Sequence, residues 1–599
     1  MGGDRGTCEV RAGVAGAIVL AATLLVASVA GAQAELRGIW SHATAMDTPG
    51  KATALADSLA NARLNAIYPL FFYWGGTAYW DSRVAPRADV VQQGFDPLAS
   101  FISLAHARGI EVHPRFVVGN YGTSELGRLF PEHPAWRLAN DRGETGDWYD
   151  LANPEVRDFM LRLVEEVATK YPVDGIHLDF IRYPGLEWGY TAAAKAGFAR
   201  ECGYSLDAIH SDGFPIIATV TGNVISGPTT ARVLAAFGDG RPAVSVNDYG
   251  RGQCLTVSWQ AFRSRTPAGD EMLRRALRQF GAQKDLLRYV LPPPTRETYG
   301  TRYADSMQAW LRENLGLAAT AVDPANLEAL DPHSVLVLPG CYLFDAASAN
   351  GLALFVGAGG RAIFVDAPIR AMDSEHIRNV SGLSKADGSL NAYTAIVAVA
   401  EHPFLPIVPG SLTAGEAVRV AEAWVRFRED QVTSLVRLMR EKLRSVRPDC
   451  LLTASVFRSV ESSKARLQDW PLWLREGLVD YVMPMAYTSD IESLRANVDE
   501  WQSLDPQWTR IIPGLAIYNV GNDSGPLPTP DAILAQYSLC RQRGARGVCF
   551  FSANQLTPEL QAALRERAFT APCPAYRPPA SRAAQSTSAG NREAAASSR

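Results

Sequence analysis

The chain has 599 residues, of which 47% are hydrophobic and 20% charged, and its formal net charge is −4. This composition describes a globular protein with enough apolar material for large cores, and the lack of a basic excess argues against a nucleic-acid partner. The 13 Trp and 20 Tyr suit a carbohydrate binder, because aromatic faces stack on sugars, although they would equally suit a large core.

The first 34 residues have the features of a secretory signal peptide. Arg5 and Arg11 precede an apolar run from Val14 to Ala30, and Ala32-Gln33-Ala34 supplies the small residues of a cleavage site before Glu35. The alternative is an uncleaved anchor of about 17 apolar residues, which is marginal for spanning a bilayer. We therefore expect a secreted or periplasmic protein with no membrane contact after cleavage.

Residues 35–205 alternate between β-rich and helical patterns. The clearest helix follows Asn153, which is expected to cap it, with Pro154 at the first helical position and apolar residues from Val156 to Val167 at helical spacing. Four strands with intervening helices form a βαβα series, which is typical of a parallel sheet. The expected strands are Leu36–Ser41, Asn65–Phe72, Ile110–Val117 and Gly175–Ile181.

Residues 206–415 have a different pattern. Ser334–Pro339 and Gly359–Val365 are expected strands, and Leu352–Val356 between them is helical. We interpret this region as a self-contained α/β domain inserted into the series. Insertions of this kind lie on the loops that follow the strands, next to the catalytic face of a barrel.

The alternating pattern resumes over residues 416–572 with four more strands. Four strands before the insert and four after it make eight, the number that closes a (β/α)₈ TIM barrel. Residues 573–599 are rich in Ala, Ser, Pro and Arg and are predicted to form a disordered tail. The expected strands of the second half are Leu451–Phe457, Val479–Tyr487, Ile511–Tyr518 and Gly547–Ser552.

The strongest chemical signal is the run Val173–Pro184 (VDGIHLDFIRYP). Alternate side chains of a strand share a face, so His177 and Asp179 are expected inside the barrel while their apolar neighbours face the helices. Asp179 lies near the carboxyl end of the strand, where barrel enzymes hold their catalytic groups. Burying an Asp costs several kcal/mol unless the carboxylate is paired or solvated at a ligand site. The alternative to a catalytic role is therefore a structural Asp bonded to Arg182 or His177.

Several linked segments resemble the glycosyl hydrolase-like family 10. The resemblance covers both barrel halves and implies a (β/α)₈ barrel with a hydrolase-like role on glycosidic bonds. The resemblance is stronger evidence for the fold than for the activity. The segments that carry it are Leu36–Trp40, Ala105–His113, His133–Trp136, Asn153–Arg157, Asp174–Pro184, Trp424–Val432, Gln468–Trp470 and Val479–Tyr487.

Glycoside hydrolysis normally takes two carboxyl groups, of which Asp179 is the first candidate. Asp469 follows the fifth strand and could be the second, but it is equally suited to cap the helix that begins at Trp470. Glu461 in the same loop and Glu187 after the fourth strand are further candidates. Each could instead be a solvated loop charge, so the second carboxylate stays open.

Sugar contacts are expected at the mouth of the barrel. Arg115, Arg182 and Tyr183 could hold hydroxyls or an anionic sugar, or each could instead pair with Asp179. An aromatic loop after the second strand could be a stacking platform or a small core under a long loop; it holds Phe72, Tyr73, Trp74, Tyr79 and Trp80. The candidate sugar-binding residues are Trp40, His113, Arg115, His177, Arg182, Tyr183, Tyr487 and Asn519.

The inserted domain places Cys341 after a strand, as in class-I glutamine amidotransferases, and resembles that fold or the trimerisation domain of certain β-galactosidases. Pro339 and Leu343 stand where a nucleophile elbow needs Gly, and Glu401-His402 has the wrong spacing and order for the acid and base. Thiol catalysis is therefore disfavoured. A structural role, or one in forming a homo-oligomer, fits the insert better.

No metal or cofactor motif is present, because the 9 His are dispersed and no Gly-rich phosphate loop follows a strand. The odd number of cysteines left after signal cleavage does not form a disulfide framework. We expect an exported glycoside hydrolase with a carbohydrate substrate and without a metal or cofactor. The alternatives are a carbohydrate-binding barrel that lacks catalysis and, less favoured, an amidase that uses Cys341.

Overall fold

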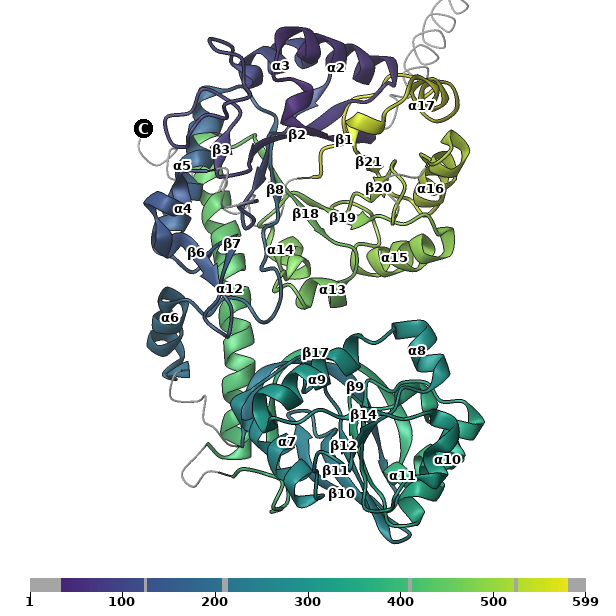
Figure 1. Ribbon diagram of the computed structural model, residues 1–599. Helices are drawn as coiled ribbons and strands as arrows, with labels where there is room; N and C mark the ends of the chain where they lie inside the picture. The colour runs from purple at the N-terminus through teal and green to yellow at the C-terminus, as the bar shows by residue number, and fades with distance from the viewer. Residues whose placement is uncertain (1–33, 123–126, 207–213, 408–411, 522–525, 580–599) are drawn as a thin grey trace, which may run out of the picture.

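The computed structural model describes residues 34–122, 127–206, 214–407, 412–521 and 526–579. These residues form a barrel and a separate inserted domain, which one long helix joins (Figure 1). Within the described ranges, no helix is long and apolar enough to cross a membrane. The expected signal peptide lies outside the described residues, except for its last residue, Ala34.

Eight parallel strands form the barrel, and β1 pairs with both β2 and β21 to close the ring. The predicted (β/α)₈ barrel is confirmed. The expected third strand is interrupted at His113 and Pro114, so that the short β4 (Glu111–Val112) precedes β5. The ring strands in chain order are β1 (Leu36–His42), β2 (Ala66–Tyr73), β5 (Arg115–Val117), β8 (Gly175–Asp179), β18 (Leu451–Phe457), β19 (Tyr481–Ala486), β20 (Gly514–Ala516) and β21 (Gly547–Phe551).

The outer helices begin where polar side chains cap them. The Asn153 side chain accepts a hydrogen bond from Glu155 N at the start of α5 (Pro154–Lys170), as the sequence predicted. Thr48, Asp96 and Thr529 cap three other helices in the same way. The remaining helices around the barrel are α2 (Pro49–Asn61), α3 (Pro97–His106), α14 (Trp470–Glu476), α15 (Ile491–Leu504), α16 (Pro530–Gln542) and α17 (Pro558–Ala563).

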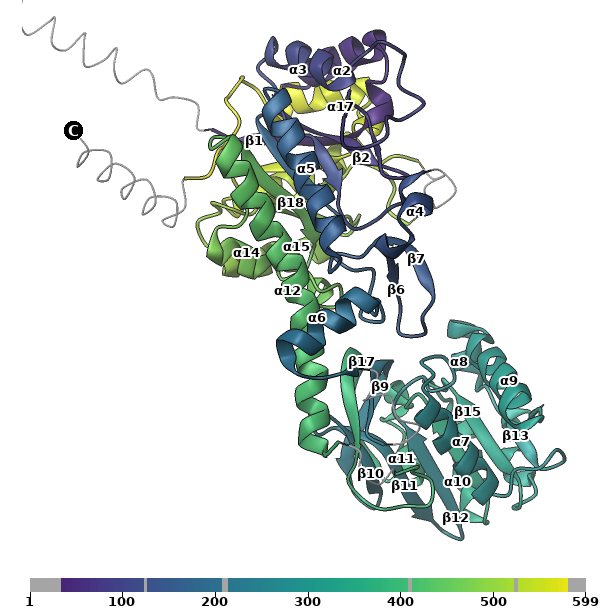
Figure 2. The same ribbon diagram turned by 90° about the vertical axis from the view of Figure 1, so that its left-hand side faces the viewer.

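Several short elements emerge on the loops that follow the strands. The antiparallel pair β6 (Arg137–Ala139) and β7 (Thr145–Tyr149) forms a hairpin between β5 and α5. The hairpin and helix α6 (Ala192–Cys202) extend from the barrel toward the inserted domain (Figure 2). Two further short helices are α4 (Leu129–Glu132) and α13 (Val460–Lys464).

The inserted domain is a nine-stranded mixed sheet with helices on both faces. β12, β13, β14, β15 and β16 are parallel, while β9, β10, β11 and β17 continue the sheet with antiparallel pairing. The likeness to an amidotransferase or a galactosidase trimerisation domain stays a prediction. The strands are β9 (Ile216–Pro228), β10 (Arg232–Phe237), β11 (Pro242–Tyr249), β12 (Gly252–Val257), β13 (Leu287–Tyr289), β14 (Thr320–Ala321), β15 (Val335–Pro339), β16 (Arg361–Val365) and β17 (Leu383–Ala398).

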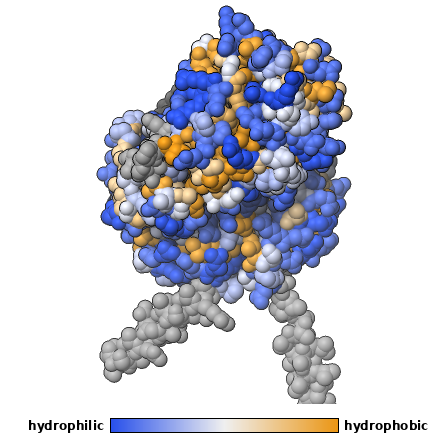
Figure 3. Space-filling model, turned by 90° about the horizontal axis from the view of Figure 1, so that it is seen from below, coloured by the Kyte–Doolittle hydropathy of each residue, from blue (hydrophilic) through white to orange (hydrophobic). Residues whose placement is uncertain are grey.

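Two separate cores flank this sheet. The first includes side chains from α7 (Pro267–Gln279) and α9 (Arg302–Leu315), and the second includes side chains from α10 (Ala346–Gly357) and α11 (Glu375–Ser381). The short helix α8 (Pro293–Tyr299) precedes α9. Seen from the end of the molecule that the insert forms, the surface carries hydrophobic patches among hydrophilic residues (Figure 3).

Helix α12 (Ala414–Val446) connects the two bodies. Its 33 residues span about 50 Å, and a capping box between Thr413 and Glu416 fixes its start. Its contacts with β9 and β17 belong to the insert, whereas those with α5 belong to the barrel. Because a barrel helix runs from the carboxyl ends of the strands back to their amino ends, the insert faces the end of the barrel where catalytic groups are held.

The C-terminal segment packs on the opposite end of the barrel. Arg577 donates to Glu111 at 2.9 Å, the Tyr576 hydroxyl donates to the Thr509 carbonyl, and Glu35 N donates to Pro574 O. These contacts hold the chain at least as far as Arg577, which lies within the tail predicted to begin at residue 573. Residues 580–599 lie outside the described part. All seven cysteines in the described ranges are free.

Candidate active site

Asp179 is the last residue of β8 and lies inside the barrel, as the alternation of the strand predicted. Its carboxylate accepts a hydrogen bond from the Arg115 guanidinium at 2.8 Å and one from Phe180 N at 2.8 Å. Asp179 is 4% exposed and Arg115 is 5% exposed. The partner of Asp179 is thus Arg115 on the adjacent strand β5, one of the pairings that the sequence left open, rather than Arg182 or His177.

The backbone after Asp179 is strained. Phe180 has a φ of 49°, a left-handed conformation that bulky side chains rarely adopt. Gly119 on the neighbouring strand end allows this segment to approach, because a Cβ there would lie 2.5 Å from Phe180 O. Such strain persists only where the surroundings enforce it, and it is enriched at catalytic and ligand-binding sites.

His177 is a buried, neutral residue beneath this pair. The Trp40 indole N–H donates to Nε2 at 3.0 Å, so Nε2 is an acceptor and the proton sits on Nδ1, which is 2.8 Å from Thr453 Oγ1. Burial, with Arg115 nearby, lowers the pKa of His177 well below its usual value. His177 therefore carries no charge at neutral pH and holds the Trp40 ring in place.

Four of the predicted sugar-binding residues are interior side chains. Trp40, His113 and His177 have no exposed surface, and Tyr183 is also buried. His113 stacks on Tyr68, with ring centroids 4.8 Å apart. These four side chains are therefore interior rather than at the rim, and their contact with sugar stays a prediction. Closure of the ring buries Trp40 and His177, which point inward below the last residue of their strands.

The rim itself is aromatic. Tyr487, one of the predicted contacts, is half-buried and lies 5.3 Å from the Phe551 ring and 5.8 Å from the Tyr518 ring. Burial and the charge of Asp179 raise the pKa of the Tyr487 hydroxyl. Phe551 was not among the predicted contacts, although its place at the end of β21 was a usable signal. Asn519 is half-buried in the loop after β20.

Arg182 is half-buried and is held by aromatic rings, with no acid bonded to it among the described residues. Its guanidinium carbon lies 5.0 Å from the Trp148 ring, 4.6 Å from Phe180 and 4.8 Å from Phe457. Burial lowers the pKa of Arg182 to about 10, an effect that the charge of Asp179 opposes. The guanidinium is still charged at neutral pH, and its Nη1 donates to the Tyr183 carbonyl at 3.4 Å.

The candidates for the second carboxylate do not share one environment. The Asp469 side chain accepts from Leu472 N at 3.2 Å and so caps α14, which is the structural alternative stated for it. Its charge also acts on Glu429 of α12, whose pKa burial raises to about 7. Glu461 is exposed on α13. No hydrogen bond or ion pair joins Asp469 or Glu461 to Asp179 in the described part of the chain.

The aromatic loop after β2 is mainly a small core. Phe72, Tyr79 and Trp80 are buried, and Trp80 stacks on Phe116 with ring centroids 5.7 Å apart. Trp74, by contrast, is 49% exposed. The core interpretation therefore holds for the three buried residues, and only Tyr73 and Trp74 present surface for stacking.

Cys341 in the insert is sealed from solvent. Its thiol donates to Val290 O at 3.2 Å, and burial raises the thiol pKa strongly. A nucleophilic cysteine needs thiolate character and access, so this environment opposes thiol catalysis. Within the described residues, no group of three or more His, Cys, Asp or Glu side chains could hold a metal ion.

Comparisons with known proteins identify the barrel. The family model described as Glycosyl hydrolase-like 10 matches residues 35–215 and 411–527, which are the two barrel segments on either side of the insert. The glycosyl hydrolase DigH of Escherichia coli (strain K12) is 33% identical over 146 residues, which are 21% of this chain and 33% of that protein. YngK of Bacillus subtilis (strain 168), also called a glycosyl hydrolase, is 27% identical over 174 residues, 25% of this chain and 34% of that protein.

The match thus spans about a third of the length of these relatives. The glycoside hydrolase domain of PgaB (BpsB) from Bordetella bronchiseptica aligns with a TM-score of 0.43 and 10% identity, covering 88% of this chain and 98% of that domain. A β-galactosidase from Marinomonas ef1 aligns with a TM-score of 0.39 and 10% identity, covering 88% and 58%. Through the barrel that its two matched segments form, the chain belongs to the glycosyl hydrolase-like family 10.

Proposed function

We propose that this protein is an exported glycoside hydrolase that cleaves a poly- or oligosaccharide with Asp179 as an essential carboxylate. The observation that carries the proposal is the position of Asp179, at the carboxyl end of β8, beneath an aromatic rim and beside a strained residue. The family membership supports a glycoside hydrolase-like role.

The pairing with Arg115 suggests which role Asp179 plays. The transition state of glycoside hydrolysis carries positive charge on the sugar ring, which a nearby carboxylate stabilises or attacks. A guanidinium is always charged and holds its carboxylate partner in a fixed orientation. Asp179 is therefore suited to act as nucleophile or base, and a different acid has to protonate the leaving oxygen.

We propose Glu187 as the first acid to test as the proton donor. It follows Asp179 by eight residues, is half-buried and lines a cavity in front of the loop after β8, together with Gly185 and Leu186. Asp469 and Glu461 remain the other two candidates. A variant that lacks the donor should still cleave aryl glycosides with good leaving groups, because these need little protonation. If Glu187 is the donor, Glu187→Gln should lose activity on natural glycans but keep activity on aryl glycosides with good leaving groups.

The second candidate function is that of a carbohydrate-binding barrel without catalysis. It is favoured by the low exposure of Asp179 and by its ion pair with Arg115, since a structural Asp would have the same surroundings. In this case the aromatic rim of Tyr487, Tyr518 and Phe551 would hold the sugar, and no second acid would be needed.

Asp179→Asn separates the two functions. Reducing-end release from a panel of glycans should fall by at least about 1,000-fold in this variant, while sugar binding survives. Asp158→Asn is the matched control, because Asp158 is exposed on the outer helix α5, where its partner is Arg162 of the same helix. If the parent protein releases no reducing ends from any glycan yet binds one, the hydrolase proposal fails and the binding function stands.

Export is part of the proposal and rests on the residues that precede Glu35. Mass spectrometry of the protein recovered from the periplasm or medium should find Glu35 as the first residue. A mature chain that keeps residues 1–34 would contradict signal cleavage. Formation of a homo-oligomer through the insert is a further proposal, which sedimentation of the full chain tests.

A further inference from the structure

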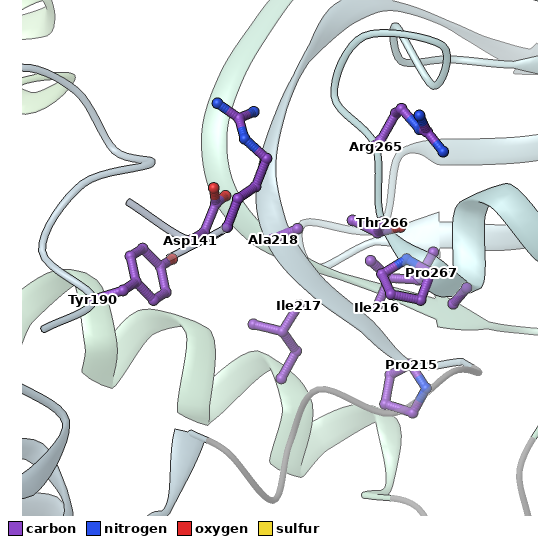
Figure 4. A pocket seen from close by; sticks show the side chains of 11 residues that line it. Asp141, Tyr190, Pro215, Ile216, Ile217, Ala218, Arg265, Thr266 and Pro267 are labelled. Carbon is purple, nitrogen blue, oxygen red and sulfur yellow. The ribbon is translucent and has the colours of Figure 1, made fainter. Parts of the chain in front are cut away.

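A cleft lies between the barrel and the inserted domain, in front of the loop that follows β8. Two adjoining cavities of about 260 and 340 Å³ form it and share Asp141, Arg142, Ala218 and Arg265 as lining residues. Asp141 and Tyr190 of the barrel face Arg265, Thr266 and Pro267 of the insert across it (Figure 4). Neither body forms this cleft alone.

A chain of contacts connects the cleft to Asp179. Arg182 and Arg466 approach the ring of Phe457, at 4.8 and 5.7 Å, and the charge of Asp179 acts on Arg182. Tyr183 N donates to Arg466 O at 3.1 Å, which ties the loop after β8 to the segment between α13 and α14. Arg466 then lines the cleft itself. A ligand bound at Asp179 could therefore continue past Arg182 and Arg466 toward the insert.

The cleft has an excess of arginine. Of its four arginines, Arg142 pairs with Glu144, and Arg265 pairs with Asp270 and Glu313. These three acids lie outside the lining of the cleft. Two acids, Asp141 and Glu187, line the cleft as well. The lining therefore carries four positive and two negative side chains.

Two of these arginines have no acidic partner. The Arg263 guanidinium lies 5.5 Å from the Tyr303 ring, and the Arg466 guanidinium lies 5.7 Å from the Phe457 ring. Within the described ranges, neither guanidinium makes a side-chain hydrogen bond or an ion pair. A guanidinium that stacks on a ring is held in position while its N–H edges remain available, which is the arrangement that recognises carboxylate, sulfate or phosphate groups.

We propose that this cleft is a substrate subsite that binds an anionic group on the glycan, with Arg466 from the barrel and Arg263 from the insert as its contacts. The proposal rests on the proposed function, because it takes the ligand to be the chain that reaches Asp179. It also gives the insert a role, since the loop with Arg263 supplies half of the site.

Binding of charged and neutral polysaccharides with the same backbone tests the proposal. The probes are polygalacturonate with its methyl ester, carboxymethyl with hydroxyethyl cellulose, and dextran sulfate with dextran, measured on the full chain by affinity electrophoresis. The parent should bind the charged member of at least one pair more tightly, and added salt should weaken that binding. Arg263→Gln and Arg466→Gln should each weaken it by about 10-fold, the size expected for a lost hydrogen bond to a charged group.

Arg278→Gln is the matched control, because Arg278 is exposed on α7, about 16 Å along that helix from the cleft loop. It should bind like the parent, and thermal unfolding should show that all three variants are folded. Arg263→Glu should weaken binding further than Arg263→Gln. Equal binding of every charged and neutral pair, or equal effects of the substitutions at 263 and 278, would overturn the proposal.

The binding test of the subsite and the hydrolysis test of Asp179 can fail independently. Loss of hydrolysis in Asp179→Asn with unchanged binding in Arg263→Gln and Arg466→Gln would leave the hydrolase and remove the anionic subsite. Charge-selective binding that depends on Arg263 and Arg466, in a parent that hydrolyses nothing, would keep the subsite and favour the non-catalytic barrel.

Discussion

Replacing Arg115 with Met should destabilise the barrel strongly, and replacing Asp179 in the same chain should reduce the damage. The two side chains form an ion pair at 2.8 Å and are 5% and 4% exposed. Arg115→Met leaves a buried carboxylate without a counter-charge, which costs about 3–5 kcal/mol of unfolding free energy. The lost hydrogen bond from Arg115 to Ser41 O is included in that range.

Asp179→Asn alone should cost less, about 1–2 kcal/mol. The amide oxygen can still accept from Phe180 N and from Arg115, so the hydrogen bonds survive with a weaker acceptor. In the double variant the amide needs no counter-charge. Arg115→Met/Asp179→Asn should therefore be more stable than Arg115→Met, with a coupling energy of about 2 kcal/mol.

Urea unfolding followed by tryptophan fluorescence measures these differences. Of the 13 Trp, only Trp259 and Trp310 lie in the inserted domain, so the signal reports mainly on the barrel. The insert can unfold separately, and circular dichroism on the same samples separates the two transitions. If Arg115→Met and the double variant unfold within about 0.5 kcal/mol of each other, the carboxylate is solvated in solution and the buried pair is refuted.

Three further predictions follow from local geometry. Gly119→Ala should lower the free energy of unfolding in urea by about 2 kcal/mol or more, because its Cβ would lie 2.5 Å from a backbone oxygen. Gly50→Ala in helix α2 is the control and should not destabilise, because its Cβ meets nothing within 4 Å. Equal effects of the two substitutions would contradict the crowding at Gly119. Burial raises the pKa of Asp150 to about 6, above its unfolded value, so the stability gained from its proton is lost as pH rises through 6. Asp150→Asn should flatten the stability profile between pH 4 and 7, and an unchanged slope would argue against the shift. Iodoacetamide should modify the half-exposed Cys202 long before the buried Cys341, as peptide mass spectrometry can show, and early labelling of Cys341 would contradict its burial.

The sequence by itself determined the barrel and the inward position of Asp179. Alternation in Gly175–Ile181 decides which side chains share a face, and caps such as Asn153 decide where helices begin. Both signals act over a few residues, so they can be read without knowing what packs nearby. The count of eight strands then followed from the repeated βα pattern, despite the insert that divides it.

Only the tertiary structure decided which residues meet. Arg115 reaches Asp179 because β5 lies beside β8 in the closed ring, and this register brings together residues that are 64 positions apart. Ring closure also buried Trp40 and His177, which alternation alone could not distinguish from residues at the rim. The cleft with Arg263 arises because helix α12 holds the insert against the catalytic end of the barrel. Neighbours of this kind depend on long-range packing, which local periodicity does not encode.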